Sequence, residues 1–242
     1  MQDERKKAVI IDFHSHILPG IDDGSKGLET SIRMLKISRE QGIDCMVATP
    51  HFHATRTSIG HFLESREEAY MLVLEHMESD MPKLIPGAEV AYFEGISEAE
   101  EIDKLTIENT GTLLLEMPFG KWNESMLTDV RRLVEDRHMQ VVLAHLERYL
   151  FTSENRKYAK KIMELPLYVQ INAGSLKDWR KSGRLIKLFK KQQAHLLGSD
   201  CHGVQYRPQD LEDGRQILEK KAGREILNNI DSLGTKILSI ND

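Results

Sequence analysis

Histidine and acidic residues recur along this 242-residue chain at spacings that suit metal binding. His14 and His16 are separated by one residue, and so are Asp200 and His202. Side chains at positions i and i+2 of an extended strand point to the same side, so each pair can reach one ion. The other candidates each follow or end a short apolar segment: Asp22, Asp23, His51, Glu89, Glu116 and His145. Imidazole nitrogen and carboxylate oxygen without a thiolate suit Mn²⁺, Fe²⁺ or Zn²⁺.

The acidic candidates indicate that more than one cation is bound. Four carboxylates brought together without cations would repel one another and raise one another's pKa: Asp23, Glu89, Glu116 and Asp200. Two or three divalent ions would balance that charge. The chain's remaining histidines are expected to be structural: His53, His61, His76, His138 and His195.

Two further acids near the first histidine pair have weaker claims. Asp12 lies two residues before His14, so in a regular strand the two side chains would point to the same side. Asp12 would either accept a hydrogen bond from a metal ligand and orient it, or simply end a strand. Asp22 would shape a turn with Gly24, the usual role of an Asp-Gly pair. The residues alone leave open which of the adjacent acids Asp22 and Asp23 binds a cation.

Short apolar segments, each followed by a polar turn, are the elements that must position these residues. Seven of them read as strands: 8–13, 45–49, 84–90, 112–116, 141–144, 168–172 and 195–198. Segments with helical periodicity lie between them: 28–41, 59–77, 124–138, 154–164, 183–192 and 211–221. Leu28, Ile32 and Leu35 recur on one face of the first of these helices, and Gly42 ends it.

Strands that alternate with helices predict parallel pairing through right-handed crossovers. About seven such units favour a closed barrel over an open sheet. In a parallel α/β barrel, the carboxyl ends of all strands meet on one face, where active sites form. The metal candidates follow the predicted strands at these ends, so we expect them to converge.

The composition fits one α/β domain over residues 1–242. Hydrophobic residues make up 40% and charged residues 29% of the chain, and no apolar run is long enough to span a bilayer.

The charged leader Met1–Lys7 precedes too short an apolar segment for export, so we expect a cytoplasmic protein. Two cysteines fit a reducing compartment. A net charge of −5, with acids and bases interspersed, predicts no nucleic-acid surface.

Seven motifs in order give the chain a family resemblance. They are FHSHILPGIDDGSK from Phe13, ATPHF at 48–52, PGAEV at 86–90, LLLEMPF at 113–119, AHLERY at 144–149, NAGSL at 172–176 and GSDCHG at 198–203, with Arg207-Pro208 after the last. The chain resembles the PHP (polymerase and histidinol phosphatase) superfamily. Within it, the chain is similar to the CpsB/CapC-like protein-tyrosine phosphatases of capsular and exopolysaccharide loci.

The resemblance implies a distorted (β/α)₇ TIM-like barrel with two or three divalent ions, Mn²⁺ foremost and Fe²⁺ or Zn²⁺ as alternatives. The ligands it implies are His14, His16, Asp23, His51, Glu89, Glu116, His145, Asp200 and His202. Arg148 and Arg207 match positions that hold phosphate. The family has no counterpart to the charged leader, and Leu146 stands where its motif has proline. Homo-oligomer formation is left open.

The implied activity is metal-dependent hydrolysis of phosphotyrosine on the tail of a bacterial tyrosine autokinase that controls polysaccharide synthesis. Divalent ions lower the pKa of water to about 7 and would supply hydroxide to attack phosphorus. Two arginines could clamp the phosphoryl group through paired N–H bonds, which lysine cannot copy. A phenol has a pKa near about 10, so no general acid is assigned.

Other functions share these features. A small phosphomonoester such as histidinol phosphate could use the same cluster, because function belongs to the site and not to the fold. A metal-dependent binding or scaffold protein is the alternative outside enzymology. The segment from Cys201 to Arg207 also fits the C-x₅-R spacing of cysteine-dependent phosphatases, but it holds a single glycine and a proline follows it. We expect Cys201 to be a packing residue.

Overall fold

The computed structural model describes residues 8–151 and 154–240, so the charged leader lies outside the described residues. Its strands are β1 (Ile11–Ser15), β2 (Cys45–Ala48), β3 (His51–Phe52), β4 (Lys83–Pro86), β5 (Glu89–Ala91), β6 (Thr112–Glu116), β7 (Gln140–Leu143), β8 (Tyr168–Asn172) and β9 (Leu196–Gly198). Its α-helices are α1 (Leu28–Glu40), α2 (Ile59–Leu74), α3 (Glu124–Glu135), α4 (Glu147–Leu150), α5 (Arg156–Ile162), α6 (Trp179–Lys190), α7 (Leu211–Ala222) and α8 (Arg224–Ile237). Three 3₁₀ turns, η1 (Ile96–Glu98), η2 (Ile102–Leu105) and η3 (Ala173–Lys177), complete the list.

All strand ladders between these elements are parallel, in the orders β1-β2-β4 and β3-β5-β6-β7-β8-β9. Strand β3 begins three residues after β2 ends, and β5 begins three residues after β4 ends. Each of these pairs therefore counts as one barrel strand with a short break in it. The ring closes between β9 and β1, where the Asp200 N–H donates to the His14 carbonyl at 2.8 Å and the His16 N–H donates to the Cys201 carbonyl at 2.9 Å. The predicted distorted seven-position barrel is confirmed.

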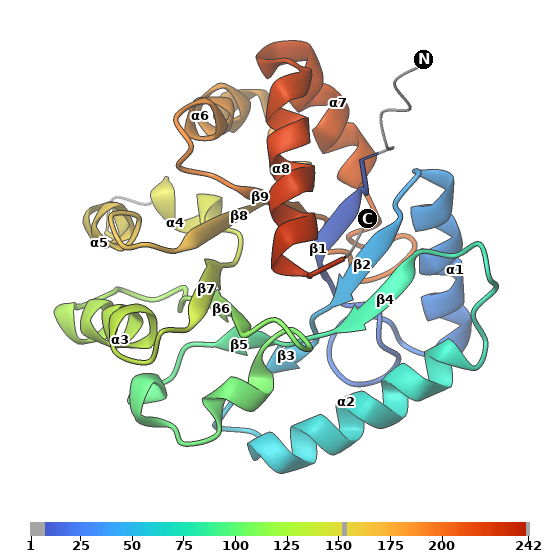
Figure 1. The fold of residues 1–242 in the computed structure, drawn as a ribbon, viewed down its shortest axis with the longest axis horizontal. Coiled ribbons are helices and arrows are strands. Elements are labelled where there is room, and N and C mark those ends of the chain that lie inside the picture. The colour runs from blue at the N-terminus through green and yellow to red at the C-terminus, as the bar shows by residue number, and fades with distance from the viewer. Residues whose placement is uncertain (1–7, 152–153, 241–242) are drawn as a thin grey trace, which may run out of the picture.

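Two apolar clusters fill the space on either side of the strands. The inner one joins alternate residues of opposite strands, among them Phe13, Leu114, Val142 and Leu196, with Ile237 at the end of α8. The outer cluster lies between the strands and the surrounding helices. Figure 1 shows these helices around the outside of the strands, with α8 lying across β1 and β9. None of the helices within 8–151 and 154–240 is both long and apolar enough to cross a membrane.

A local irregularity in β1 changes where its side chains point. Asp12 pairs with Met46, but Ser15 pairs with Ala48, so β1 holds one residue more than β2 over this interval. Such a β-bulge turns the residues that follow it relative to those before it. Asp12 and His14 therefore do not share a face, and the strand parity expected for these two residues is wrong.

Most predicted elements are present with shifted ends. Helix α6 begins at Trp179, four residues before the prediction, because the Asp178 side chain accepts a hydrogen bond from the Arg180 N–H at 3.0 Å and caps it. The single strand expected over 84–90 is two strands, since the chain breaks at Gly87 and Ala88. Strand β3 and helices α4 and α8 were not predicted; α8 is separated from α7 only by Gly223, which has a φ of 94°.

Candidate metal centre and active site

The structure brings all nine predicted metal ligands together at the carboxyl ends of the strands. Their donor atoms form three overlapping groups in which every atom lies within 4.8 Å of the others. The groups are His14, His16 and Glu89; His16, Asp23, His51 and His202; and His51, Glu89 and Glu116. His145 and Asp200 contact the first group and so complete the set.

The innermost group is fully enclosed by protein. His14 Nε2 and His16 Nε2 are 3.1 Å apart, and each lies 3.2 Å from Glu89 Oε2. Asp200 Oδ1 is 3.4 Å from His16 Nε2. Three of these side chains, His14, His16 and Glu89, are 0% exposed. Two ring nitrogens and two carboxylate oxygens thus face one enclosed point.

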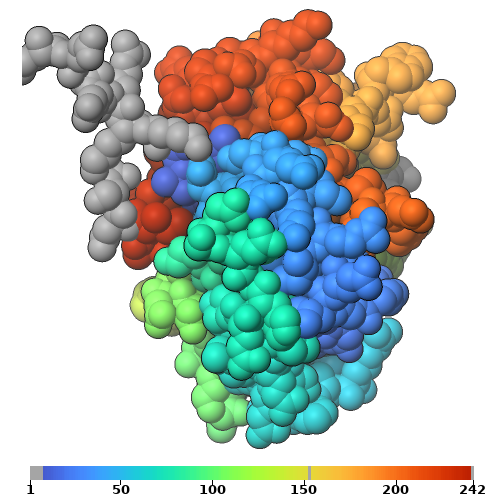
Figure 2. Space-filling model, turned by 90° about the vertical axis from the view of Figure 1, so that its right-hand side faces the viewer, coloured from blue at the N-terminus to red at the C-terminus, as the bar shows by residue number. Residues whose placement is uncertain are grey.

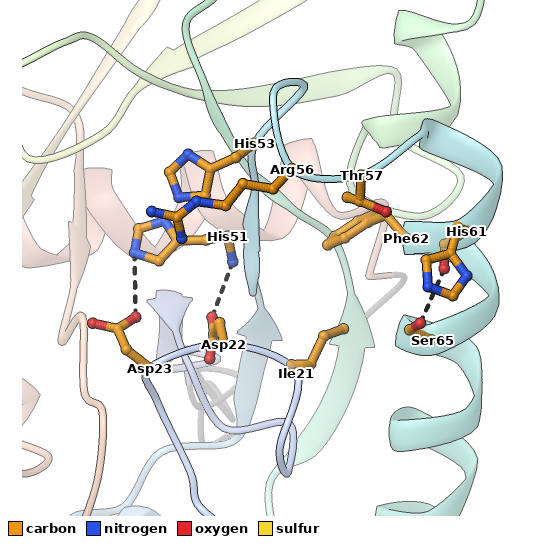
Figure 3. A pocket seen from close by; sticks show the side chains of 10 residues that line it. All are labelled: Ile21, Asp22, Asp23, His51, His53, Arg56, Thr57, His61, Phe62 and Ser65. Carbon is orange, nitrogen blue, oxygen red and sulfur yellow. Dashed lines mark hydrogen bonds and ion pairs between the residues drawn. The ribbon is translucent and has the colours of Figure 1, made fainter.

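The outer groups open toward solvent. His51 Nε2 is 3.7 Å and His202 Nε2 3.6 Å from Asp23 Oδ1, whose side chain is exposed. Figure 3 shows Asp23 and Asp22 reaching His51 from the loop after β1. On the other side of His51, Glu89 links inward to His145, with 2.7 Å between His145 Nε2 and Glu89 Oε1. Glu89 therefore lies at the centre of the whole cluster.

The donor atoms fit divalent cations. Glu89 Oε2 and His51 Nδ1 are buried without a hydrogen-bond partner in the described part of the chain, although they lie 3.0 Å apart. Buried polar atoms are normally paired, so atoms left unpaired toward a shared point are what a cation site requires. Nitrogen and oxygen donors without sulfur suit Mn²⁺, Fe²⁺ or Zn²⁺.

Electrostatics lead to the same conclusion. Burial alone would raise the pKa of Glu89 and Asp200, but the neighbouring histidines hold both well below the usual value for a carboxyl. Burial would lower the pKa of His145, but Glu89 and Glu116 overcome it and raise that pKa to about 9. The carboxylates therefore stay ionised only with positive charge beside them, which imidazolium or a divalent cation supplies.

The two predicted phosphate arginines lie at the mouth of the cluster. Arg148 Nη2 donates to Asp200 Oδ2 at 2.6 Å, and Arg207 Nη2 contacts the same oxygen. Arg207 Nη1 lies 2.9 Å from His202 Nε2. Both guanidinium groups are about one-third exposed. They line a cavity of about 220 Å³ together with Asp23, His51, Glu89, Glu116 and the exposed ring of Phe119. A phosphoryl group entering that cavity would meet both arginines and the metal ligands.

A family model described as capsular polysaccharide synthesis, CpsB/CapC, matches residues 10–237. The chain belongs to the CpsB/CapC family. It is 30% identical to tyrosine-protein phosphatase YwqE of Bacillus subtilis, over 90% of this chain and 87% of the relative, and 27% identical to tyrosine-protein phosphatase CpsB of Streptococcus pneumoniae, over 88% and 91%.

Solved structures confirm the fold of this CpsB/CapC chain. One of them comes from a study of YwqE of B. subtilis and CpsB of S. pneumoniae, which it describes as unique metal-dependent tyrosine phosphatases. It superposes on this chain with a TM-score of 0.80 at 22% identity, and the match covers 96% of both chains. An amidohydrolase from Bifidobacterium longum subsp. infantis superposes with a TM-score of 0.57 at 16% identity and covers 97% of this chain and 100% of its own.

Three residues of the CpsB/CapC site have backbone angles that sequence reasoning missed. His145, Asp200 and Arg207 have φ values of 31°, 55° and 47°, in the left-handed region that few non-glycine residues adopt. Asp200 lies beyond the end of β9, so strand alternation does not explain its orientation. Asp200 Oδ1 lies 3.6 Å from His202 Nδ1, and a bent loop, not a regular strand, brings these side chains together. Such strain is common where surrounding contacts fix functional residues.

Polar residues behind the ligands were also missed. Asp22 accepts from His16 Nδ1 at 2.7 Å, from the His51 N–H at 2.9 Å and from the Gly24 N–H at 2.9 Å, so it orients two ligands besides shaping the turn. Gln170 Oε1 accepts the His145 N–H at 2.8 Å and lies 3.2 Å from His14 Nδ1. The sequence did offer a signal for Gln170, because a polar amide side chain stands inside the otherwise apolar strand β8.

Asp12 fixes the backbone of the site and does not contact a ligand ring. Its carboxylate accepts from the Ser199 N–H at 2.8 Å, from Ser199 Oγ at 2.6 Å and from Gln209 Nε2 at 2.7 Å. It also accepts the His14 N–H at 3.3 Å. These bonds tie the bulge of β1 to the loop after β9. Of the two roles considered for Asp12, the structure supports an outer acceptor, acting through the main chain.

Cys201 has no access to the cavity. Its side chain is 0% exposed within the outer apolar cluster, and burial raises the pKa of the thiol. A thiolate nucleophile needs a lowered pKa and access to phosphorus. The structure therefore supports a packing role for Cys201, as expected.

Proposed function

We propose that this CpsB/CapC protein is a metal-dependent protein-tyrosine phosphatase. One observation carries the proposal: two guanidinium groups converge over a closed set of histidine and carboxylate donors, in a cavity large enough for a phosphoryl group. The relatives named tyrosine-protein phosphatases, matched over most of their length, support the same substrate. A scaffold would need neither arginine.

In this proposal the nine clustered residues hold two or three divalent ions, with Mn²⁺ as the preferred metal: His14, His16, Asp23, His51, Glu89, Glu116, His145, Asp200 and His202. The ions would supply hydroxide at neutral pH and neutralise phosphoryl oxygens. Asp22 and Gln170 hold the ring tautomers of His16 and His14 that leave Nε2 free to face the cluster.

Arg148 and Arg207 bind the nonbridging oxygens of the phosphoryl group. Both contact the Asp200 carboxylate oxygen Oδ2, and this convergence on one anionic atom supports the proposed role. Paired N–H donors fix the orientation of the phosphoryl group as well as its charge. The tyrosyl oxygen leaves as a phenolate, whose low basicity makes a dedicated proton donor unnecessary.

The finer parts of the proposal concern where the enzyme acts. We assign its substrate to phosphotyrosines on the tail of a bacterial tyrosine autokinase that controls capsular or exopolysaccharide synthesis, and its location to the cytoplasm. Residues 1–242 act as one domain. The family description supports the link to capsular polysaccharide synthesis, and the names of the relatives support phosphotyrosine as the substrate.

Initial rates on three substrates test the proposal: a phosphotyrosine peptide, a phosphoserine peptide and histidinol phosphate. We expect hydrolysis of the phosphotyrosine peptide that is lost with EDTA and restored by Mn²⁺, and much slower hydrolysis of the other two. A preference for histidinol phosphate would replace the proposal with a small-molecule phosphatase. Activity that persists in EDTA would refute the metal site, and a Cys201→Ser variant checks the thiolate route.

A further inference from the structure

A second, larger cavity adjoins the proposed active site. It has a volume of about 660 Å³ and lies between the loop after β1 and the segment from β3 into α2. Asp23, His51 and His53 line both this cavity and the 220 Å³ cavity over the metal ligands. Figure 2 shows the face of the molecule on which the blue segment of α1 and the cyan segment of α2, the helix that borders this cavity, lie side by side. We call these two adjoining cavities, which share three lining side chains, the groove.

The acidic groups of the larger cavity already have partners. Asp22 accepts hydrogen bonds from His16, Gly24 and His51. Asp23 Oδ1 is turned toward His51 and His202. The Asp22 carboxylate is therefore occupied, and Asp23 forms no ion pair with an arginine of the described residues.

Arg56 lines the same cavity, and neither of these carboxylates balances its positive charge. It is exposed, and none of the acidic residues in the described ranges forms an ion pair with it. Figure 3 shows its side chain extending from the loop between β3 and α2 toward His53 and His51 and over the cavity. A guanidinium without a carboxylate, placed beside a cavity, is ready to bind an anionic ligand group.

The loop that carries Arg56 is well defined by hydrogen bonds. The N–H groups of Arg56 and Thr57 donate to the His53 carbonyl at 2.9 Å and 3.2 Å. Ser58 then caps α2 by accepting the His61 N–H at 3.3 Å. Below the loop, the rings of Phe52 and Phe62 pack with centroids 5.3 Å apart. Arg56 is thus presented from a braced turn, so less entropy is lost when it binds a ligand.

We infer that this cavity binds the peptide segment next to the phosphotyrosine, and that Arg56 selects an acidic residue there. The inference rests on the proposed function. The reacting phosphoryl group occupies the smaller cavity, so the flanking peptide must lie along the groove that leads from it. Consecutive residues of an extended peptide are about 3.3–3.6 Å apart, so a residue within a few positions of the phosphotyrosine reaches the adjoining cavity.

A charge reversal tests the inference. Wild type and Arg56→Glu are compared on three phosphotyrosine peptides that carry Glu, Gln or Lys on both sides of the phosphotyrosine, and on p-nitrophenyl phosphate, which has no flanking residues. We expect wild type to prefer the Glu peptide. We expect Arg56→Glu to lower kcat/KM for the Glu peptide at least tenfold more than for p-nitrophenyl phosphate, and to shift the preference toward the Lys peptide.

Arg33→Glu is the matched control, because it makes the same charge change at an exposed arginine of α1 that does not line the cavity. It should leave the peptide preference as in wild type. Equal losses on the Glu peptide and on p-nitrophenyl phosphate would overturn the inference and place Arg56 with the phosphoryl-binding arginines. An unchanged preference in Arg56→Glu would also overturn it. If wild type hydrolyses none of the phosphate esters, the proposed function itself fails.

Discussion

At the scale of single residues, the site depends on side chains that meet the same atom from different directions. Asp200 contacts the imidazole of His16 through Oδ1 and both arginines through Oδ2. Residue types at the strand ends indicated the cluster, but the choice of Asp23 over Asp22 rested on the family resemblance. It carries no signal for which oxygen serves which neighbour, because this depends on the left-handed backbone at Asp200 and Arg207.

Arg207→Lys tests whether paired donors matter beyond charge. Lysine keeps the positive charge and is equally compatible with the local backbone, but it cannot donate two parallel N–H bonds. We expect kcat/KM on p-nitrophenyl phosphate to fall by roughly 100-fold, the lower end of the range of about 100- to 1,000-fold seen when one transition-state donor is lost. Mn²⁺ content, measured by elemental analysis, should match wild type because Arg207 is not a ligand. Undiminished activity would show that charge alone suffices.

At the scale of elements, the alternation of short apolar strands with helices predicted the barrel well, because each such unit supplies one parallel strand position with its covering helix. It failed where the backbone departs from regular geometry. The bulge in β1 separates Asp12 from His14, and the breaks after β2 and β4 bring His51 and Glu89 into register as partners. These departures depend on pairing between segments far apart in the chain, so a local pattern could not reveal them.

Gly198→Ala tests how closely β9 must approach β1. A Cβ at this position would lie 2.5 Å from His14 Cβ and 3.1 Å from the His14 nitrogen, so the two strands would have to separate. Such overpacking costs about 1–3 kcal/mol in the free energy of unfolding and should also weaken Mn²⁺ binding through His14. Urea denaturation and metal titration measure the two effects.

Gly183→Ala is the control for that substitution. It lies in α6, and among the described residues no atom beyond its chain neighbours and the nearby backbone of the helix lies within 4 Å of its Cβ position. Alanine in a helix interior should stabilise the protein by about 0.5–1 kcal/mol. If Gly198→Ala behaves like this control, the close approach of β1 and β9 is not required.

The start of α7 supplies a pH-dependent contribution to stability. Asp210 precedes α7, its Oδ1 is buried without a hydrogen-bond partner among the described residues, and burial raises its pKa to about 6. A carboxyl whose folded pKa exceeds its unfolded value of 3.8 binds protons preferentially in the folded state. Its contribution to stability is present at low pH and is lost as the pH rises from about 4 to about 6.

Asp210→Asn should remove this pH dependence. The free energy of unfolding, measured by urea denaturation at pH 4 and pH 8, should rise relative to wild type mainly at pH 8, where the native carboxylate is charged. Lys177 Nζ, 3.9 Å from Asp210 Oδ2, offsets part of the gain. A variant that is less stable than wild type at pH 8 would show that the charge at the start of α7 stabilises the helix more than burial destabilises it.

At the scale of the whole molecule, the metal cluster and the barrel depend on each other. The donors come from the ends or following loops of β1, β3, β5, β6, β7 and β9, so no pair of neighbouring strands supplies them alone. Buried carboxylates and imidazoles at this face are costly to bring together unless cations balance them. The same ions that support catalysis should therefore stabilise the fold.

Thermal unfolding with and without Mn²⁺ tests this dependence without reference to activity. A ligand that binds only the folded state at 100 times its Kd adds about 2.7 kcal/mol, which raises Tm by roughly 5–11 °C for a chain of this size. We expect such a rise on adding Mn²⁺ to EDTA-treated protein. Glu89→Gln should abolish the rise, because Glu89 contacts His14, His16, His51 and His145 and belongs to two of the three groups. A Tm that is the same in EDTA and in Mn²⁺ would show that Mn²⁺ does not bind preferentially to the folded protein. Cations would then not hold the strand ends together.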